Sequence, residues 1–148
     1  MAPMEKNLLA LDLGKGSLGM AISRSGLFVT PLPEVRFPGG HYEKAIEAVS
    51  SLLEKEKVER FVLGLPLFPS GDECEMTPIV HSFAKRLEVA FPAIPVSFQD
   101  ERYTTVEASQ AMHTNGKNSK KQKASIDSVA AAMILERYLD AVGQGGEI

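Results

Sequence analysis

The chain has 148 residues, of which 44% are hydrophobic and 24% charged, as is typical of one soluble globular domain. Its single cysteine, Cys74, excludes an intramolecular disulfide framework and a cysteine-rich zinc site. The formal charge of −3 gives no overall attraction to nucleic acid, so binding of a polyanion would need a local basic patch. No signal-peptide pattern and no run of roughly 20 apolar residues is present, so the expected location is the cytoplasm.

Hydrophobic periodicity and turn residues predict helices and strands along the chain. In chain order, strands are expected at 7–13, 18–23, 27–36, 60–65 and 94–100. Helices are expected at 41–57, 77–91, 104–115 and 125–142, with a polar, lysine-rich loop over 117–123. A hairpin meander followed by strand–helix alternation predicts an α/β fold, a mixed sheet flanked by helices. Residues 7–142 are expected to form one domain, between an N-terminal extension (1–6) and a flexible tail (143–148).

Three carboxylates occupy positions where a charge disfavours folding. Asp12 ends an apolar strand, Glu101 follows the strand expected at 94–100, and Asp127 precedes two alanines and an isoleucine on one helix face. An unpaired carboxylate there costs several kcal/mol unless a partner or a metal offsets it. Carboxylates converging from distant parts of a chain are what an oxygen-seeking divalent cation requires. Together they predict a Mg²⁺- or Mn²⁺-dependent phosphodiester hydrolase.

Each acid also has an ordinary structural interpretation. Asp12 is compatible with a hydrogen-bonding residue at a strand end, and Glu101 with an ion pair in a solvated loop. Asp127 is compatible with a first-turn aspartate that the helix dipole stabilises by roughly 0.3–1 kcal/mol. Only the three together favour a metal site. Asp100 alternates to the opposite side of its strand, so whether it contributes beside Glu101 stays open.

Basic residues near these acids are candidates for binding nucleic-acid phosphates. Acidic metal ligands repel a polyanion, and nearby lysines offset that repulsion while adding salt-dependent affinity. In isolation, a short lysine run is ordinary solvated surface. The expected nucleic-acid-binding residues are Lys15, Arg102, Lys117, Lys120, Lys121 and Lys123.

Four motifs in order resemble the YqgF/RuvX family, a bacterial group with a ribonuclease H-like fold related to Holliday-junction resolvases. They are Leu-Asp-Leu-Gly followed by Leu-Gly-Met-Ala-Ile-Ser, then Val-Leu-Gly-Leu-Pro-Leu, then Gln-Asp-Glu-Arg-Tyr-Thr-Thr-Val-Glu-Ala, then Lys-Ala-Ser-Ile-Asp-Ser-Val-Ala-Ala-Ala. Each motif is weak alone, and their order and spacing are fairly specific. The resemblance covers about residues 7–141.

The resemblance implies a ribonuclease H-like, five-stranded mixed sheet with its first three strands antiparallel, and a two-metal site at Asp12, Glu101 and Asp127. It further implies processing of the 5′ end of the small-subunit ribosomal RNA precursor. Three departures concern substrate preference. The family commonly has Gly-Thr-Lys-Arg where this chain has Gly-Lys-Gly-Ser, an asparagine where Phe68 stands, and arginines where lysines precede the last helix.

The leading hypothesis is an endonuclease that trims pre-16S ribosomal RNA, acting on structured RNA or on the assembling ribosome. The nearest alternative is a resolvase of four-way DNA, for which a homodimer rather than a monomer is expected. A different class is a non-catalytic RNA-binding factor in ribosome assembly. A nucleotide hydrolase of the actin-like relatives of this fold is disfavoured, because one short domain lacks the second half that encloses the nucleotide.

Overall fold

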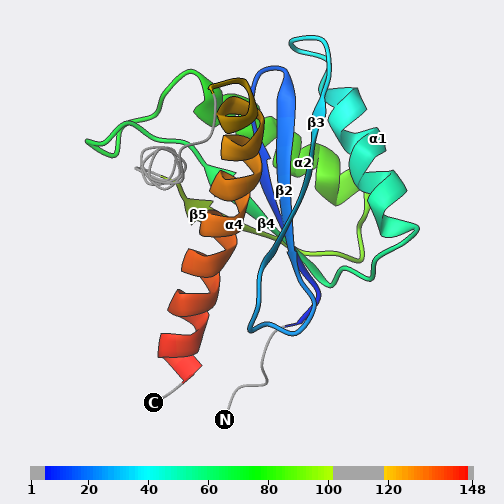
Figure 1. The fold of residues 1–148 in the computed structure, drawn as a ribbon, viewed down its shortest axis with the longest axis vertical. Helices are drawn as coiled ribbons and strands as arrows, with labels where there is room; N and C mark the ends of the chain where they lie inside the picture. Colours follow the sequence, from blue (N-terminus) through cyan, green and yellow to red (C-terminus); the bar gives the residue numbers. More distant parts are fainter. Residues whose placement is uncertain (1–5, 102–118, 147–148) are drawn as a thin grey trace.

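A five-stranded mixed sheet forms the centre of the molecule (Figure 1). The computed structural model describes residues 6–101 and 119–146. Its strands are β1 (Leu8–Leu13), β2 (Ser17–Ser23), β3 (Thr30–Arg36), β4 (Arg60–Leu65) and β5 (Val96–Asp100). The order is β3-β2-β1-β4-β5, in which β1 to β3 are antiparallel neighbours and β1, β4 and β5 are parallel. This confirms the predicted mixed sheet with three antiparallel strands.

Helices cover both faces of the sheet. Helices α1 (Tyr42–Leu53) and α2 (Met76–Ala90) lie on one face, and α4 (Ser119–Gly146) crosses the other (Figure 1). Strand residues alternate between the two resulting cores, as a pleated strand requires. In β1, Leu9 and Leu11 pack on the α1–α2 side, whereas Leu8 and Ala10 pack against α4.

Small residues let α4 approach the sheet closely. Ala130, Ala131 and Ala132 are buried on this helix, and Ala131 and Ala132 pack with the apolar side chains of β1, β2 and β4. Without larger side chains between them, the helix backbone lies near the strands. The first turns of α4 lie near the end of the sheet at which β1, β4 and β5 terminate (Figure 1).

The last helix begins earlier and ends later than the sequence predicts. It starts at Ser119 rather than 125 and runs to Gly146 rather than 142. The lysine-rich segment was wrongly predicted as a loop because it is polar, but lysine, glutamine and alanine are good helix formers. The helix expected at 104–115 lies outside the described residues. In the part of the chain that the structure describes, no helix has the length and apolar content needed to span a bilayer.

The third strand is shorter than predicted. It begins at Thr30 rather than 27, because Ser25 Oγ accepts hydrogen bonds from the backbone N–H groups of Leu27 and Phe28 and holds them in the turn. Its pairing with β2 shifts register between Leu18 and Met20, which forms a bulge.

The β1–β2 connection is tied to the segment that follows β3. Gly14 N–H donates to Ser17 O at 2.8 Å and closes the turn. Phe37 N–H donates to Gly16 O and Gly40 N–H to Lys15 O, both at 3.0 Å. These bonds fix the backbone around Lys15 beside the end of β1.

Candidate nuclease site at the carboxyl ends of the parallel strands

Asp12 lies at the carboxyl end of β1 on the face that α4 covers. It follows Leu8 and Ala10 by the two-residue alternation of a strand, and both of these pack in the core beneath α4. Its direct cross-strand neighbour is Gly19, which places no side chain beside the carboxylate. Asp12 is partly buried. The Asp12 carboxylate therefore lies where the central strand β1 ends.

Glu101 follows β5 immediately and extends over β4. Its backbone N–H donates to Leu65 O at 3.2 Å, which continues the parallel pairing by one residue. A Cβ added to Gly64 would lie 2.7 Å from Glu101 Oε2 and 2.5 Å from Ile134 Cδ1. A Cβ at position 64 would therefore force the ends of these two side chains to move.

The Asp12 and Glu101 side chains are in contact, and this strongly perturbs the titration of Glu101. Burial raises the pKa of Glu101 to about 10, assisted by the negative charge of Asp12 and by a side-chain hydrogen bond with it. The charges of Cys74 and Asp100 act in the same direction. Two close carboxylates that share one proton are the arrangement in which a divalent cation can replace the proton. The donor set fits a hard, oxygen-liganded metal.

Asp127 is placed only by its backbone. It lies on α4 seven residues before Ile134, hence on the same side of the helix as the residue that approaches Gly64. The position of its side chain is outside the described part, so its role as a ligand stays a prediction. Among the residues whose side chains are described, no three of the types His, Cys, Asp and Glu form a metal-binding group.

The predicted basic residues divide into two groups. Lys15 Nζ forms an exposed ion pair with Glu75 Oε1 at 3.2 Å, which links the β1–β2 turn to the start of α2. Three of the lysines, Lys120, Lys121 and Lys123, lie on the first two turns of α4 instead of in a loop. Arg102 and Lys117 lie outside the described residues.

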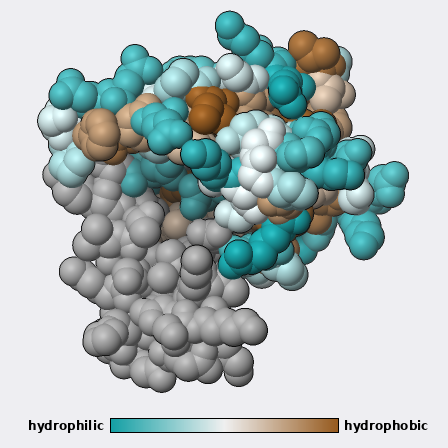
Figure 2. Space-filling model, turned by 90° about the horizontal axis from the view of Figure 1, so that it is seen from above, coloured by the Kyte–Doolittle hydropathy of each residue, from teal (hydrophilic) through white to brown (hydrophobic). Residues whose placement is uncertain are grey.

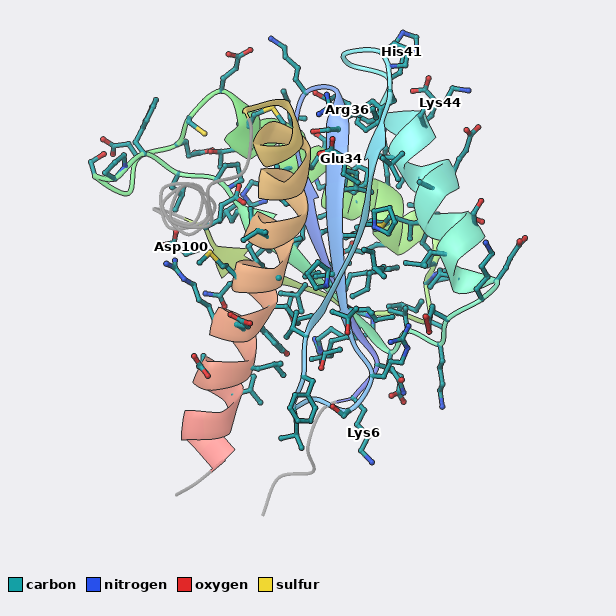
Figure 3. The ribbon with its side chains drawn as sticks, viewed as in Figure 1. Lys6, Glu34, Arg36, His41, Lys44 and Asp100 are labelled. Carbon is teal, nitrogen blue, oxygen red and sulfur yellow. The ribbon has the colours of Figure 1, made fainter. Side chains whose placement is uncertain are left out.

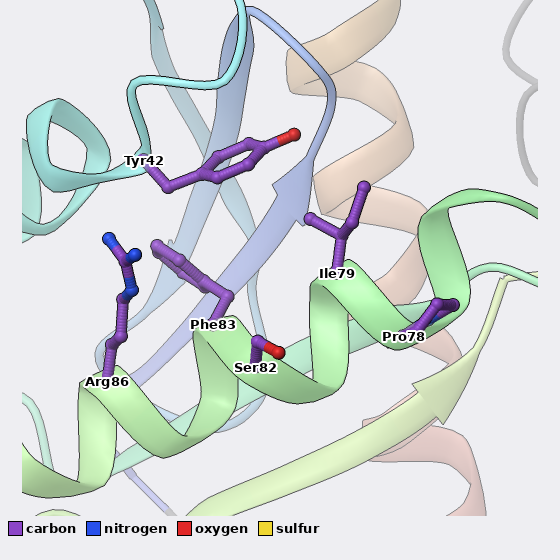
Figure 4. Close-up of a pocket in the computed structure, with 6 residues that line it drawn as sticks. All are labelled: Tyr42, Pro78, Ile79, Ser82, Phe83 and Arg86. Atoms are coloured by element: carbon purple, nitrogen blue, oxygen red, sulfur yellow. The ribbon is translucent and has the colours of Figure 1, made fainter.

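A pocket lined partly by aromatic side chains lies on the opposite face of the sheet. Figure 4 shows it between α1 and α2, lined by Tyr42, Phe83, Arg86 and three neighbours, with a volume of about 240 Å³. Its walls contain no carboxylate. It is separated from Asp12 by the sheet itself, so it does not belong to the candidate site.

Comparison with known proteins gives the family. Residues 6–141 match the sequence profile described as "RuvX: Holliday junction resolvase". The chain belongs to the RuvX family. A relative from Methylobacillus flagellatus, named "Putative pre-16S rRNA nuclease", is 36% identical over 91% of each chain. A Chloroflexus aurantiacus relative of the same name is 38% identical over 90% of this chain and 86% of its own.

These matches confirm the resemblance deduced from the four motifs and the expectation of a phosphodiester-bond hydrolase. The fold agrees with RuvC from T. thermophilus, solved in complex with a Holliday junction substrate, at a TM-score of 0.56. The two proteins are 17% identical, and the match covers 94% of this chain and 97% of RuvC. RuvC therefore supports the ribonuclease H-like fold of this RuvX protein.

Sequence reasoning missed a basic residue on the edge strand of this RuvX protein. Arg36 Nε is 2.6 Å from Glu34 Oε1, and the arginine side chain is 57% exposed whereas that of Glu34 is 6% exposed (Figure 3). Arg36 is the register partner of Ser17, on the strand next to the β1–β2 turn. The alternation Glu-Val-Arg was a possible signal, but two prolines made the segment look irregular.

Sequence reasoning also assigns Cys74 no role. Its Sγ lies 3.4 Å from Thr77 Oγ1, and this hydrogen bond lowers the pKa of the thiol. Cys74 is close enough to Glu101 for its charge to raise the pKa of that carboxyl. The connection between β4 and α2 therefore borders the carboxylate pair, which spacing in the sequence could not indicate.

Proposed function

We propose that this RuvX protein is a metal-dependent endonuclease that cuts structured RNA and matures the 5′ end of the pre-16S ribosomal RNA in the cytoplasm. The observation that carries the proposal is the contact between Asp12 and Glu101 at the carboxyl ends of β1 and β5, where burial and like charge raise the pKa of Glu101 to about 10. The names of the relatives supply the choice of RNA.

The residues that would hold the metal are Asp12, Glu101 and Asp127. Bound Mg²⁺ or Mn²⁺ would lower the pKa of an attacking water and stabilise charge on the leaving oxygen. Gly64 keeps the Glu101 carboxylate within reach of Asp12, because any side chain at that position would displace it. Ile134 of α4 and the Glu101 carboxylate both lie against Gly64, so the helix passes beside the pair.

Basic side chains around the pair would hold the backbone phosphates. Lys15 and Arg36 flank the β1–β2 turn, and each is already oriented by a carboxylate on the protein. Ion pairs of this kind add little to stability, but they restrict where the cation can point. The lysines of α4, with Arg102 and Lys117, would extend this positive rim along the substrate. Such contacts orient the nucleic acid and carry no sequence information.

The test is cleavage of labelled pre-16S RNA in Mg²⁺, in Mn²⁺ and in chelator. Wild type is compared with Asp12→Asn, Glu101→Gln and Asp127→Asn. Asp140→Asn is a matched control, because Asp140 is an exposed aspartate on the same helix. We expect metal-dependent cutting that the first three variants lose and the control keeps. A folded Asp12→Asn protein that cuts like wild type refutes the assignment.

A second candidate substrate is four-way DNA, which the family description favours. A four-way junction included in the same assay separates the two, and a stable dimer by sedimentation would accompany junction cutting. Salt-sensitive RNA binding without any cutting would instead indicate a non-catalytic assembly factor.

A further inference from the structure

The connection between β4 and α2 contains a hydrogen-bonded hairpin that carries Phe68. Phe68 N–H donates to Asp72 O at 2.9 Å, and Gly71 N–H donates back to Phe68 O at 2.8 Å. Leu67 and Glu73 pair as an antiparallel bridge below them. Gly71 has φ of +94°, the left-handed conformation that closes a three-residue hairpin loop. Both backbone groups of Phe68 are thus satisfied, and its position is fixed by the turn.

This hairpin is anchored directly beside the carboxylate pair. Leu65 O accepts the backbone N–H of Glu101, and Pro66 O accepts the buried hydroxyl of Thr77 at 2.6 Å. Phe68 is three residues beyond Leu65, and three residues of extended chain span about 10 Å. Its backbone is therefore within about 10 Å of the residue that bonds the Glu101 backbone.

The Phe68 side chain is turned outward. It is 53% exposed, although the hairpin around it is polar. The only more exposed phenylalanine of the described residues is Phe28, 77% exposed in the β2–β3 turn at the other end of the sheet. Figure 2 looks down on the end of the molecule where β1 ends, and hydrophobic residues there form small separate patches on a mostly hydrophilic surface. Among the described residues in this view, no continuous apolar face of the kind that docks another protein is present.

We propose that Phe68 is a stacking platform for an unpaired nucleobase adjacent to the scissile phosphate. The inference rests on the proposed nuclease function and narrows its substrate to RNA with an unstacked nucleotide at the cut. Aromatic side chains stack on any base, because every base has a π-face, and paired bases inside a helix cannot reach such a platform. A rigid hairpin loses little conformational freedom when the base stacks on it.

The experiment uses the Asp12→Asn protein in chelator, so that binding is measured without cleavage. Phe68→Ala, Phe68→Leu and Phe68→Trp are compared with the matched control Phe28→Ala. The probes are a short single-stranded RNA that carries the fluorescent base aminopurine and a blunt duplex of the same sequence. Aminopurine fluorescence falls when the base stacks, which a purely structural role of the side chain would not change.

We expect Phe68→Ala to weaken single-strand binding roughly 5- to 150-fold and to abolish the fluorescence change. Phe68→Leu should behave like Phe68→Ala, Phe68→Trp should retain stacking, and duplex binding should stay the same in all variants. Phe28→Ala should match its parent. Equal loss on single strand and duplex, or a Phe68→Leu protein that binds and quenches like the parent, overturns the proposal.

The two proposals fail separately. Stacking is read without metal, so it can be seen even where wild type cuts nothing, and then only the nuclease assignment fails. Conversely, if wild type cuts RNA and Phe68→Ala cuts and binds it equally well, only the stacking proposal fails.

Discussion

Replacing Glu101 by glutamine should stabilise the metal-free protein, and only above mildly acidic pH. Burial and the charge of Asp12 raise the pKa of Glu101 from 4.5 to about 10. A carboxyl whose pKa is higher in the folded state binds an extra proton on folding between those two values. Its contribution to stability is therefore fully present below pH 4.5 and is lost as the pH rises toward 10. Glutamine resembles the protonated acid and has no such dependence.

The magnitude follows from the distance between the ordinary pKa and the working pH. Neutral pH is about 2.5 pH units above the ordinary pKa of 4.5, and each unit corresponds to about 1.4 kcal/mol. The buried carboxyl therefore lowers the free energy of unfolding at pH 7 by about 3 kcal/mol. For a chain of 148 residues this corresponds to a gain of roughly 6–12 °C in the melting temperature of Glu101→Gln. At pH 4 the two proteins should be equally stable.

The measurement is urea unfolding in chelator at several pH values between 4 and 8. Glu88→Gln is the control, since Glu88 is an exposed residue of α2. We expect the free energy of unfolding of wild type to fall relative to Glu101→Gln as pH rises, and Glu88→Gln to follow wild type. A constant difference between wild type and Glu101→Gln at all pH values would refute the reasoning. Added Mg²⁺ should stabilise wild type more than the variant.

Three other substitutions test the geometry. Gly64→Ala should lower the free energy of unfolding by about 1–3 kcal/mol and reduce activity, because its Cβ would lie 2.7 Å from Glu101 Oε2. Gly39→Ala, which has nothing within 4 Å, should leave the melting temperature unchanged. Arg36→Ala should lower the slope of log K against log salt by about one unit in RNA binding, whereas Arg86→Ala, on the far face, should not. Thr77→Val should destabilise by about 1–3 kcal/mol through loss of the hydroxyl contacts to Pro66 O and Cys74 N, and Thr77→Ser should retain most of that stability in urea unfolding.

The sequence predicted the architecture well because local patterns determine it. Alternating and continuous apolar runs identified all five strands, and the strand–helix order implied a mixed sheet. Asp12 and Glu101 come from distant segments and lie in contact, while their role as metal ligands stays a prediction. The predicted start of the last helix is wrong, because the polarity of Lys120 and its neighbours resembles that of a loop, whereas polar residues also suit an exposed helical turn.

The parts of the site that the sequence could not indicate depend on tertiary contacts. The ion pair of Glu34 with Arg36 is on a strand whose pairing with β2 contains a bulge, and a bulge changes which side chains face the helix. The proximity of Cys74 to Glu101 arises because the β4–α2 connection folds back over the strand ends. Neither the residue types nor their spacing in the sequence indicates that this connection folds back over the strand ends.

The face of the sheet beneath α4 can be covered only after the last helix has been synthesised. On the α4 side, β1 supplies the apolar side chains Leu8 and Ala10, and their cover is Ala131, Ile134 and Leu135 of the last helix. During translation the sheet can pair before that helix has left the ribosome, but this face then remains solvated. Asp12 and Glu101 would stay hydrated and far less perturbed until the helix docks. A chain whose last helix has not yet docked therefore lacks the buried carboxylate pair on which the proposed nuclease centre depends.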